Sequence, residues 1–443
     1  MKVFKNINES HYAYITRTFS ILVGPISVYF IYKYVNLETQ GFISTFQSFL
    51  SLILIFELGL TQVLITFISH EKDEIRFNNQ FLKGTLSKLN YIKEIFKFAL
   101  KWYLGASLCL FFSSLIIGFL IFDSSSDNIL WKFPWIIFVI FLSFNLFTFL
   151  FLSFMEGLGK LKDVYLLRFL YTVIFALSFW LFLYLDFNLW SLPLSYLISM
   201  IPYLFFIYKY RKIFSQLNRL NVKKLSNSFN WTKDLLPLQI KIAISALSSF
   251  FAISTMTPMT FVFYGAEEAG RMGLSLTILL AVIGLTTVLV SVNFHKFGVL
   301  ASNKDIKAMD KLVMRLTLIV LILSTLLIIS ILISFYFVES LFPDILTRLM
   351  PMSSFIYFAI GMIFSSLGAP MGAYLRAHKI DPIMKISLIS SIVVLISNYI
   401  ALEYFSIQTL PIFYAIVVSS AFPFVVIFYF IHRRNYYKRE INF

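Results

Sequence analysis

Charged residues are scarce in this sequence. Only 13% of its 443 residues are Asp, Glu, Lys or Arg, whereas about a quarter is usual for a soluble domain. Hydrophobic residues make up 59%, and the mean hydropathy is +0.83. This composition argues against a soluble protein of several domains. It predicts an integral membrane protein, because each crossing of a bilayer needs only about 20 apolar residues.

Cysteines, metal-binding clusters and nucleotide-binding motifs are also missing. Cys109 is the only cysteine, so an intrachain disulfide is excluded. The histidines are far apart in the sequence and lack metal-ligand spacing, so neither a metal nor a cofactor is expected. They are His11, His70, His295, His378 and His432. No G-x-x-x-x-G-K-[ST] motif occurs, and the polar segments are too short for a catalytic domain. We therefore expect that the chain is not an enzyme.

The sequence is instead dominated by long apolar runs. They predict about twelve transmembrane helices, near residues 12–32, 42–69, 95–122, 133–155, 165–185, 191–208, 235–258, 269–293, 312–337, 352–374, 383–402 and 411–431. Every backbone polar group inside a bilayer must be hydrogen-bonded within the protein, so each run is predicted to be a helix. The predicted fold class is all-α integral membrane.

The net charge of +15 is distributed unevenly between the runs. Lys and Arg are concentrated in the N-terminus, in segments 70–94, 156–164, 209–234, 294–311 and 375–382, and in the tail 432–443. The alternate segments contain only Lys33 and Arg348. By the positive-inside rule the basic set is cytoplasmic, and both termini are predicted there. This alternation favours a membrane protein over a partner of nucleic acid.

The longest basic segment divides the predicted helices into two sets of six. We expect an N-terminal lobe over 1–208, a cytoplasmic linker over 209–234, a C-terminal lobe over 235–431 and a cytoplasmic tail over 432–443. The second span reads Gly-Leu-Thr-Gln-Val-Leu from Gly59, and the eighth reads Gly-Leu-Thr-Thr-Val-Leu from Gly284. Such a match predicts a parallel repeat, with lobes related by a pseudo-two-fold axis along the membrane normal.

A few ionisable residues lie inside the predicted spans, where each costs roughly 2.5–3.5 kcal/mol at the helix centre. Arg17, Lys101 and Lys241 lie within the first, third and seventh spans. Arg271 is near the outer end of the eighth, and Glu57 is in the middle of the second. The excess of cations predicts a cavity for an anionic solute, because a low-dielectric wall strengthens their attraction for phosphate. The alternative is a structural ion pair between Glu57 and Arg17 or Lys241.

Several motifs lie in the region of the seventh and eighth predicted spans: Lys241–Ser245, Thr257-Pro258, Gly265 and Ala269–Leu276. Three further segments are Tyr374–Lys379 with Asp381-Pro382, Glu57–Leu60 and Met155–Lys160. The first set resembles the seventh and eighth helices of Wzx-type O-antigen and polysaccharide flippases. The three further segments resemble, in the same order, the loop after the tenth helix, the second helix and the loop after the fourth helix of that family. This family belongs to the superfamily of multidrug, oligosaccharidyl-lipid and polysaccharide exporters. The chain departs from the usual pattern in having Arg271 in place of Gln and Glu57 in place of Asp.

The resemblance implies a flippase of the bacterial inner membrane that functions in lipopolysaccharide O-antigen or capsule synthesis. It would carry undecaprenyl-pyrophosphate-linked oligosaccharide to the periplasmic leaflet by alternating access. Arg17, Lys101, Lys241 and Arg271 would bind the substrate, and Glu57 would couple transport by exchanging a proton or by pairing with a cation. The implied partners are this lipid-linked substrate, membrane lipids, a polysaccharide polymerase and a chain-length regulator.

Two alternatives remain open. A cation-coupled multidrug or metabolite antiporter of the same superfamily would favour acidic rather than basic cavities. A membrane enzyme such as a polysaccharide polymerase would usually need a larger external loop, and the predicted outer loops are all short.

Overall fold

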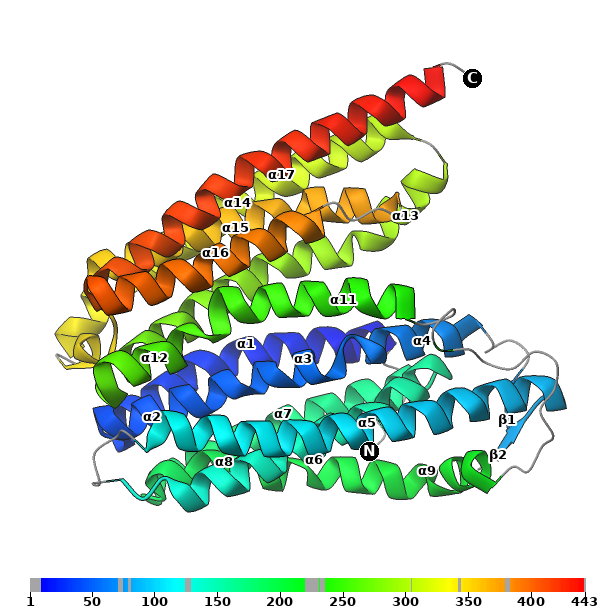
Figure 1. Ribbon diagram of the computed structural model, residues 1–443, viewed down its shortest axis with the longest axis horizontal. Helices are drawn as coiled ribbons and strands as arrows, with labels where there is room; N and C mark the ends of the chain where they lie inside the picture. The colour runs from blue at the N-terminus through cyan, green and yellow to red at the C-terminus, as the bar shows by residue number, and fades with distance from the viewer. Residues whose placement is uncertain are drawn as a thin grey trace. The chain divides into compact units, whose positions relative to one another are not determined.

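The computed structural model describes residues 9–70, 75–78, 81–123, 129–219, 231, 236–303, 305–341, 344–378 and 383–441. Helices account for nearly all of this part of the chain, and they are accompanied by a two-stranded antiparallel β-hairpin (Figure 1). The all-α fold predicted from the apolar runs is thus confirmed.

The chain divides into two compact units. Unit 1 comprises Met1–Val35 and Phe49–Ala246, and unit 2 comprises Asn36–Ser48 and Leu247–Phe443. The segment Asn36–Ser48 therefore packs with the second unit, although it lies early in the chain. The lobe boundaries predicted at residues 208 and 235 are not tested by this grouping and stay a prediction.

Unit 1 contains α1 (Glu9–Tyr34), α3 (Leu52–Glu57), α4 (Leu60–His70), β1 (Arg76–Asn78), β2 (Phe81–Lys83), α5 (Leu86–Phe122), α6 (Lys132–Gly157), α7 (Leu161–Tyr184), α8 (Ser191–Ser199) and α9 (Ile201–Arg219). It also contains most of α11 (Leu236–Ser249). Short 3₁₀ turns cover Phe49–Ser51 and Asn188–Trp190. The hairpin lies beside α9 (Figure 1), where the Gln216 side chain exchanges two 2.9 Å hydrogen bonds with the backbone of Leu82.

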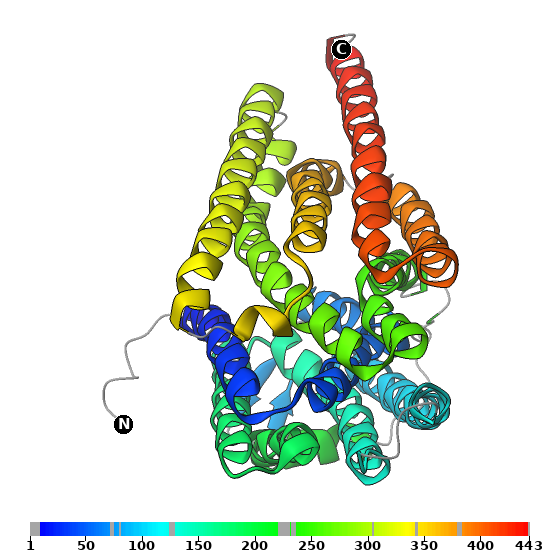
Figure 2. The ribbon, with the colours of Figure 1, turned by 90° about the vertical axis from the view of Figure 1, so that its left-hand side faces the viewer.

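Unit 2 is built from the remaining helices: α2 (Leu37–Ser48), a π-helix (Phe250–Ser254), α12 (Met256–Val292), α13 (Phe294–Ser302), α14 (Ile306–Leu341), α15 (Met352–Ala377), α16 (Ile383–Tyr404) and α17 (Leu410–Ile441). Two 3₁₀ turns, Ile345–Arg348 and Ile407–Thr409, precede α15 and α17. Helix α17 packs against both α15 and α16, and Figure 2 shows it beside α16.

Ten helices of the described chain are long and apolar enough to cross a membrane. One of them, Gln239–Ala301, runs for 63 residues through both the seventh and the eighth predicted spans. Helix α1 is not among the ten. With α1 included and the long segment counted as two spans, the structure matches the predicted number of about twelve.

The structure differs from the predicted boundaries at three places. The second predicted span is interrupted, because α3 ends at Glu57 and α4 begins at Leu60. The predicted outer loop 259–268 is helical except at Gly265, whose φ of 85° and ψ of −179° turn the backbone within α12. The first eleven residues of the predicted linker continue α9 to Arg219. Apolarity marks where a helix enters the bilayer, and helices readily extend beyond that point or break within it.

Helices α2 and α12 pack closely along a seam of small residues within unit 2. A Cβ atom on Gly41 would overlap the backbone of Ala266, and one on Gly273 would overlap the Ser44 side chain. Gly270 faces the backbone of Gly41 at the same crossing. Small residues allow membrane helices to approach this closely and gain dispersion contacts. The motif Ala269–Leu276, which carries part of the family resemblance, therefore lies on a packing surface.

A polar side chain reinforces this seam. Gln40 is fully buried on α2, and its amide nitrogen donates hydrogen bonds to the carbonyl oxygens of Gly270 (2.9 Å) and Arg348 (3.0 Å). Hydrogen bonds between membrane helices add stability and fix the register of the pair. These hydrogen bonds thus connect the segment Leu247–Phe443 of unit 2 to α2, which lies more than 200 residues earlier in the sequence.

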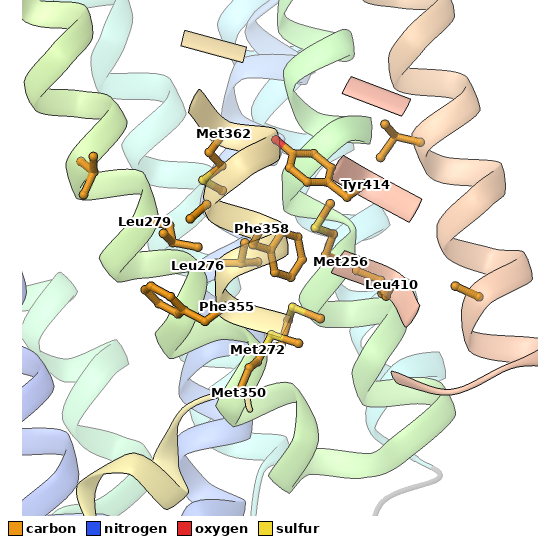
Figure 3. Packing of buried hydrophobic residues seen from close by; sticks show 14 of the residues in the cluster. Met256, Met272, Leu276, Leu279, Met350, Phe355, Phe358, Met362, Leu410 and Tyr414 are labelled. Atoms are coloured by element: carbon orange, nitrogen blue, oxygen red, sulfur yellow. The ribbon is translucent and has the colours of Figure 1, made fainter. Parts of the chain in front are cut away.

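The core of unit 2 contains several methionines. Met256 and Met272 of α12 are buried together with Met350 and with Met362 of α15. Figure 3 shows them with the aromatic side chains Phe355 and Phe358 of α15. Methionine is unbranched and adapts to irregular spaces, which suits the packing of several helices around one aromatic cluster.

The predicted orientation has a direct test. Reporter fusions near Lys223 are expected to read out in the cytoplasm and fusions near Ser125 in the periplasm, because basic segments are retained inside. Both residues lie outside the described part of the chain. A periplasmic signal at Lys223 would overturn the orientation.

Candidate functional site

The interrupted second span creates a buried polar site in unit 1. Leu58 and Gly59 separate α3 from α4, and both have left-handed backbone conformations, with φ of 51° and 72°. This conformation costs a residue with a Cβ atom about 1 kcal/mol or more, so the surrounding structure must maintain it. Ile242 of α11 covers the break, since a Cβ on Gly59 would overlap its side chain.

Glu57 is the last residue of α3 and is 5% exposed. Its carboxylate accepts a hydrogen bond of 2.8 Å from the backbone N–H of Thr61, in the first turn of α4. The first amides of a helix lack partners within the helix, and the helix dipole favours a negative charge at that end. Glu57 therefore caps the second half of its own broken span. Among the described side chains, no cation pairs with it.

A chain of hydrogen bonds continues from Glu57 to the next helix. Thr61, whose N–H binds the carboxylate, also contacts Tyr103 through its side chain, and the distance between the hydroxyls of Thr61 and Tyr103 is 2.8 Å. Tyr103 belongs to α5 and is fully buried. If the Tyr103 hydroxyl is the donor in this bond, the Thr61 hydroxyl accepts it and can turn its own proton toward the Glu57 carboxylate. The site can therefore rearrange its hydrogen bonds whenever the charge of the carboxylate changes.

Two of the predicted cavity cations lie on the surface of unit 1. Lys101 on α5 and Lys241 on α11 are both exposed, and neither has an ion-pair partner among the described residues. Lys241 directly precedes Ile242, the residue that covers the Gly59 break. Arg17 lies in α1, but its side chain is outside the described part of the structure.

Arg271 is in a different setting from the lysines. It lies on α12 of unit 2, where its guanidinium pairs with Glu268 one turn earlier and donates a hydrogen bond of 3.0 Å to the Thr347 carbonyl. The charge of Arg271 is thus balanced locally, and it is the one predicted cation with a described ion pair. The spacing of Glu268 and Arg271 is a standard signal for a pair on one helix face, and it was readable in the sequence.

Sequence reasoning identified Glu57 as a deep acid but missed Thr61 and Tyr103. A threonine and a tyrosine are common in membrane helices, and nothing in their spacing indicates that they meet. The structure brings Glu57 and Lys241 to the same unit, and each is next in sequence to a residue at the Leu58–Gly59 break or packed against it. Within the described side chains they do not form the ion pair that was one of the alternatives.

No protein-family model and no curated protein match this sequence. Solved structures of MATE transporters do match the fold. An inward-facing multidrug resistance MATE family transporter of the MOP superfamily has a TM-score of 0.67 at 14% identity, with 96% of this chain and 99% of that chain covered. An outward-facing conformation of such a transporter has a TM-score of 0.60 at 14% identity, with 96% of both chains covered.

A third structure comes from Pyrococcus furiosus and is described as a MOP superfamily transporter in which reverse polarity of the binding pocket suggests a different function. Its TM-score is 0.58 at 14% identity, and 96% of this chain and 94% of that chain are covered. At 14% sequence identity, the likeness to these structures establishes the fold alone. The chain is a multi-pass membrane protein with the fold of the MATE transporters.

Proposed function

We propose that this chain is an alternating-access flippase for undecaprenyl-pyrophosphate-linked oligosaccharide. It would take an O-antigen or capsule repeat unit from the cytoplasmic leaflet of the inner membrane and release it into the periplasmic leaflet. The observation that supports this substrate is the pair of exposed lysines, Lys101 and Lys241, which lie in membrane helices without an ion-pair partner among the described residues.

The polarity of unit 1 is the main reason to prefer an anionic substrate. Its deep carboxylate, Glu57, is buried and caps α4, whereas Lys101 and Lys241 are exposed. A cation at the edge of a low-dielectric region attracts phosphate more strongly than it would in water. One structural neighbour is described as having a binding pocket of reversed polarity, and exposed lysines would have the corresponding effect here.

The individual residues would have distinct roles. Lys101, Lys241 and Arg17 would hold the pyrophosphate, and Glu57 would couple its movement to a proton or a cation. Arg271 would contribute only if the substrate displaced Glu268, because its charge is balanced by that residue in the structure. The lipid tail would remain in the bilayer during transport, and a polysaccharide polymerase and a chain-length regulator would act on the product.

The decisive experiment is deletion of the gene. We expect undecaprenyl-pyrophosphate oligosaccharide to accumulate on the cytoplasmic side while surface polysaccharide is lost. A second candidate, a multidrug antiporter, draws support from the multidrug MATE transporters among the structural neighbours. It predicts instead that surface polysaccharide is normal in the deletion strain and that cationic drugs accumulate in the cells.

Neutralising the lysines should weaken transport. Lys101→Gln and Lys241→Gln are each expected to lower flipping of the pyrophosphate lipid in reconstituted vesicles about tenfold, which corresponds to about 1.4 kcal/mol of lost binding. Lys241→Arg should retain most of the activity because it keeps the charge. Lys83→Gln is a suitable control, because Lys83 is exposed on β2 and lies outside the spans. Unchanged flipping by both Gln variants would remove the lysines from the site.

A further inference from the structure

A cluster of three aromatic rings lies in unit 1, next to the lysine-bearing stretch of α5. Phe98 and Trp102 are one helical turn apart, and the ring of Trp231 contacts both, with centroid distances of 5.6 and 5.7 Å. The rings of Phe98 and Trp102 are 6.1 Å apart. All three side chains are partly exposed, so the cluster has aromatic surface left for a further contact.

Gln239 of α11 lies beside these rings. It is only 2% exposed, and its side-chain oxygen accepts a hydrogen bond of 2.9 Å from the Trp231 indole N–H. Its amide nitrogen is buried, and so is the indole nitrogen of Trp102. Neither of these two donors has an acceptor among the residues that the structure describes.

Unmatched donors of this kind are unusual in a cluster that only anchors a helix at the membrane surface. Tryptophans at such surfaces direct their N–H groups toward water, where acceptors are plentiful. A buried donor without an acceptor costs roughly 1–3 kcal/mol. A ligand with several acceptor oxygens that packed against the exposed aromatic surface would satisfy both donors.

We propose that Phe98, Trp102, Trp231 and Gln239 form a binding subsite for a sugar ring. The C–H face of a pyranose packs on an aromatic ring, and its hydroxyl or acetamido oxygens accept hydrogen bonds from buried N–H donors. Opening of the Trp231–Gln239 contact would admit the sugar, whose hydroxyl would then replace the indole N–H as the donor to the Gln239 oxygen.

Two lysines of α5 directly adjoin the aromatic residues of the cluster in the sequence. Lys97 directly precedes Phe98, and Lys101 directly precedes Trp102, so a row of cations runs beside the row of rings. In a lipid-linked oligosaccharide the first sugar is attached directly to the pyrophosphate. The inference rests on the proposed function and adds to it a specific contact with the first sugar.

The test uses the full-length protein in nanodiscs and a lipid in two forms. The first form is the polyprenyl-pyrophosphate oligosaccharide extracted from cells in which the gene is deleted. The second is undecaprenyl pyrophosphate, the same lipid stripped of its sugar. We expect the first form to bind at least about tenfold more tightly and to change tryptophan fluorescence, because the added sugar satisfies two buried donors.

Two conservative variants locate the effect. Trp102→Phe keeps an aromatic ring but removes the N–H, and Gln239→Leu keeps the approximate volume but removes the amide. Each is expected to reduce the preference for the glycosylated lipid to about threefold or less, with the affinity for the stripped lipid unchanged. The control is Trp190→Phe, because Trp190 lies in a 3₁₀ turn of unit 1 outside this cluster and is 36% exposed.

The outcomes separate the two proposals. If the unmutated protein binds both lipids equally, or if both variants keep its preference, the sugar subsite is wrong and the flippase proposal stands. If no such lipid accumulates in the deletion strain, or if neither form binds, the flippase proposal fails and the subsite fails with it. The fluorescence measurement on unmutated protein gives a result even if one variant does not fold.

Discussion

Replacing Glu57 with Gln is expected to reduce polysaccharide export at least about tenfold, an effect of about 1.4 kcal/mol or more, while the amount of protein in the membrane stays normal. Glutamine keeps the shape of the side chain and an oxygen that can accept the Thr61 N–H, so the cap of α4 is largely preserved. What is lost is the charge. Glu57→Asp keeps the charge on a shorter side chain and is expected to retain part of the activity.

Two coupling routes make the carboxylate necessary, and vesicle assays separate them. If Glu57 exchanges a proton as the protein alternates, collapsing the pH gradient should slow transport by the unmutated protein. If Glu57 instead pairs with a cation when the site is empty and releases it to the pyrophosphate, the gradient should have no effect. Normal export by Glu57→Gln at normal abundance would contradict both routes, and Glu57 would then be a structural cap.

Replacing Gly41 with Val is expected to remove most folded protein from the membrane. The first side-chain carbon at this position would overlap the backbone of Ala266, and a helix backbone cannot yield as the end of a flexible side chain can. Separating α2 from α12 would also stretch the hydrogen bonds of Gln40 to Gly270 and Arg348. Overpacking alone typically costs about 1–3 kcal/mol, and the lost contacts along the seam add to that cost. Membrane abundance and the thermal unfolding temperature of the purified protein measure the effect.

Gly284→Ala is the matched control for Gly41→Val. Gly284 lies on α12, but a Cβ atom there would meet no other atom within 4 Å. Alanine also favours the helix over glycine by about 1 kcal/mol, so this variant should be as stable as the unmutated protein or slightly more so. Equal abundance of the Gly41 and Gly284 variants would show that the seam is not needed for folding.

The sequence predicted the membrane class and the positions of most spans, because apolarity and the lack of charge are direct consequences of burial in lipid. It did not predict the break at Leu58–Gly59. A glycine within a span is common, and Ile242, which packs against Gly59 at the break, is distant in sequence. The helical extension of α9 was missed because its last turns are polar.

The candidate site was likewise predicted only in part, because a sequence pattern shows an unusual residue but not its contacts with other helices. Glu57 stood out because one acid in an apolar run needs an explanation. Its partners Thr61 and Tyr103 did not stand out, since hydrogen bonding between two ordinary side chains depends on how α4 and α5 pack. The motif around Gly270 resembled a transporter family, yet the structure gives its small residues a packing role against α2.

The assignment of α2 to unit 2 has a consequence for biosynthesis. Gln40 and its partner Gly270 are separated by 230 residues, and at typical rates of translation a ribosome needs roughly 10–50 s to make that length. Throughout that interval the glycine face of α2 is in the membrane without the helix against which it packs in the mature protein. A nascent chain released before α12 has been inserted would therefore expose the small residues of α2 that face α12 in the mature protein, together with Gln40, which is buried there. A membrane chaperone or a quality-control protease can recognise such exposed groups.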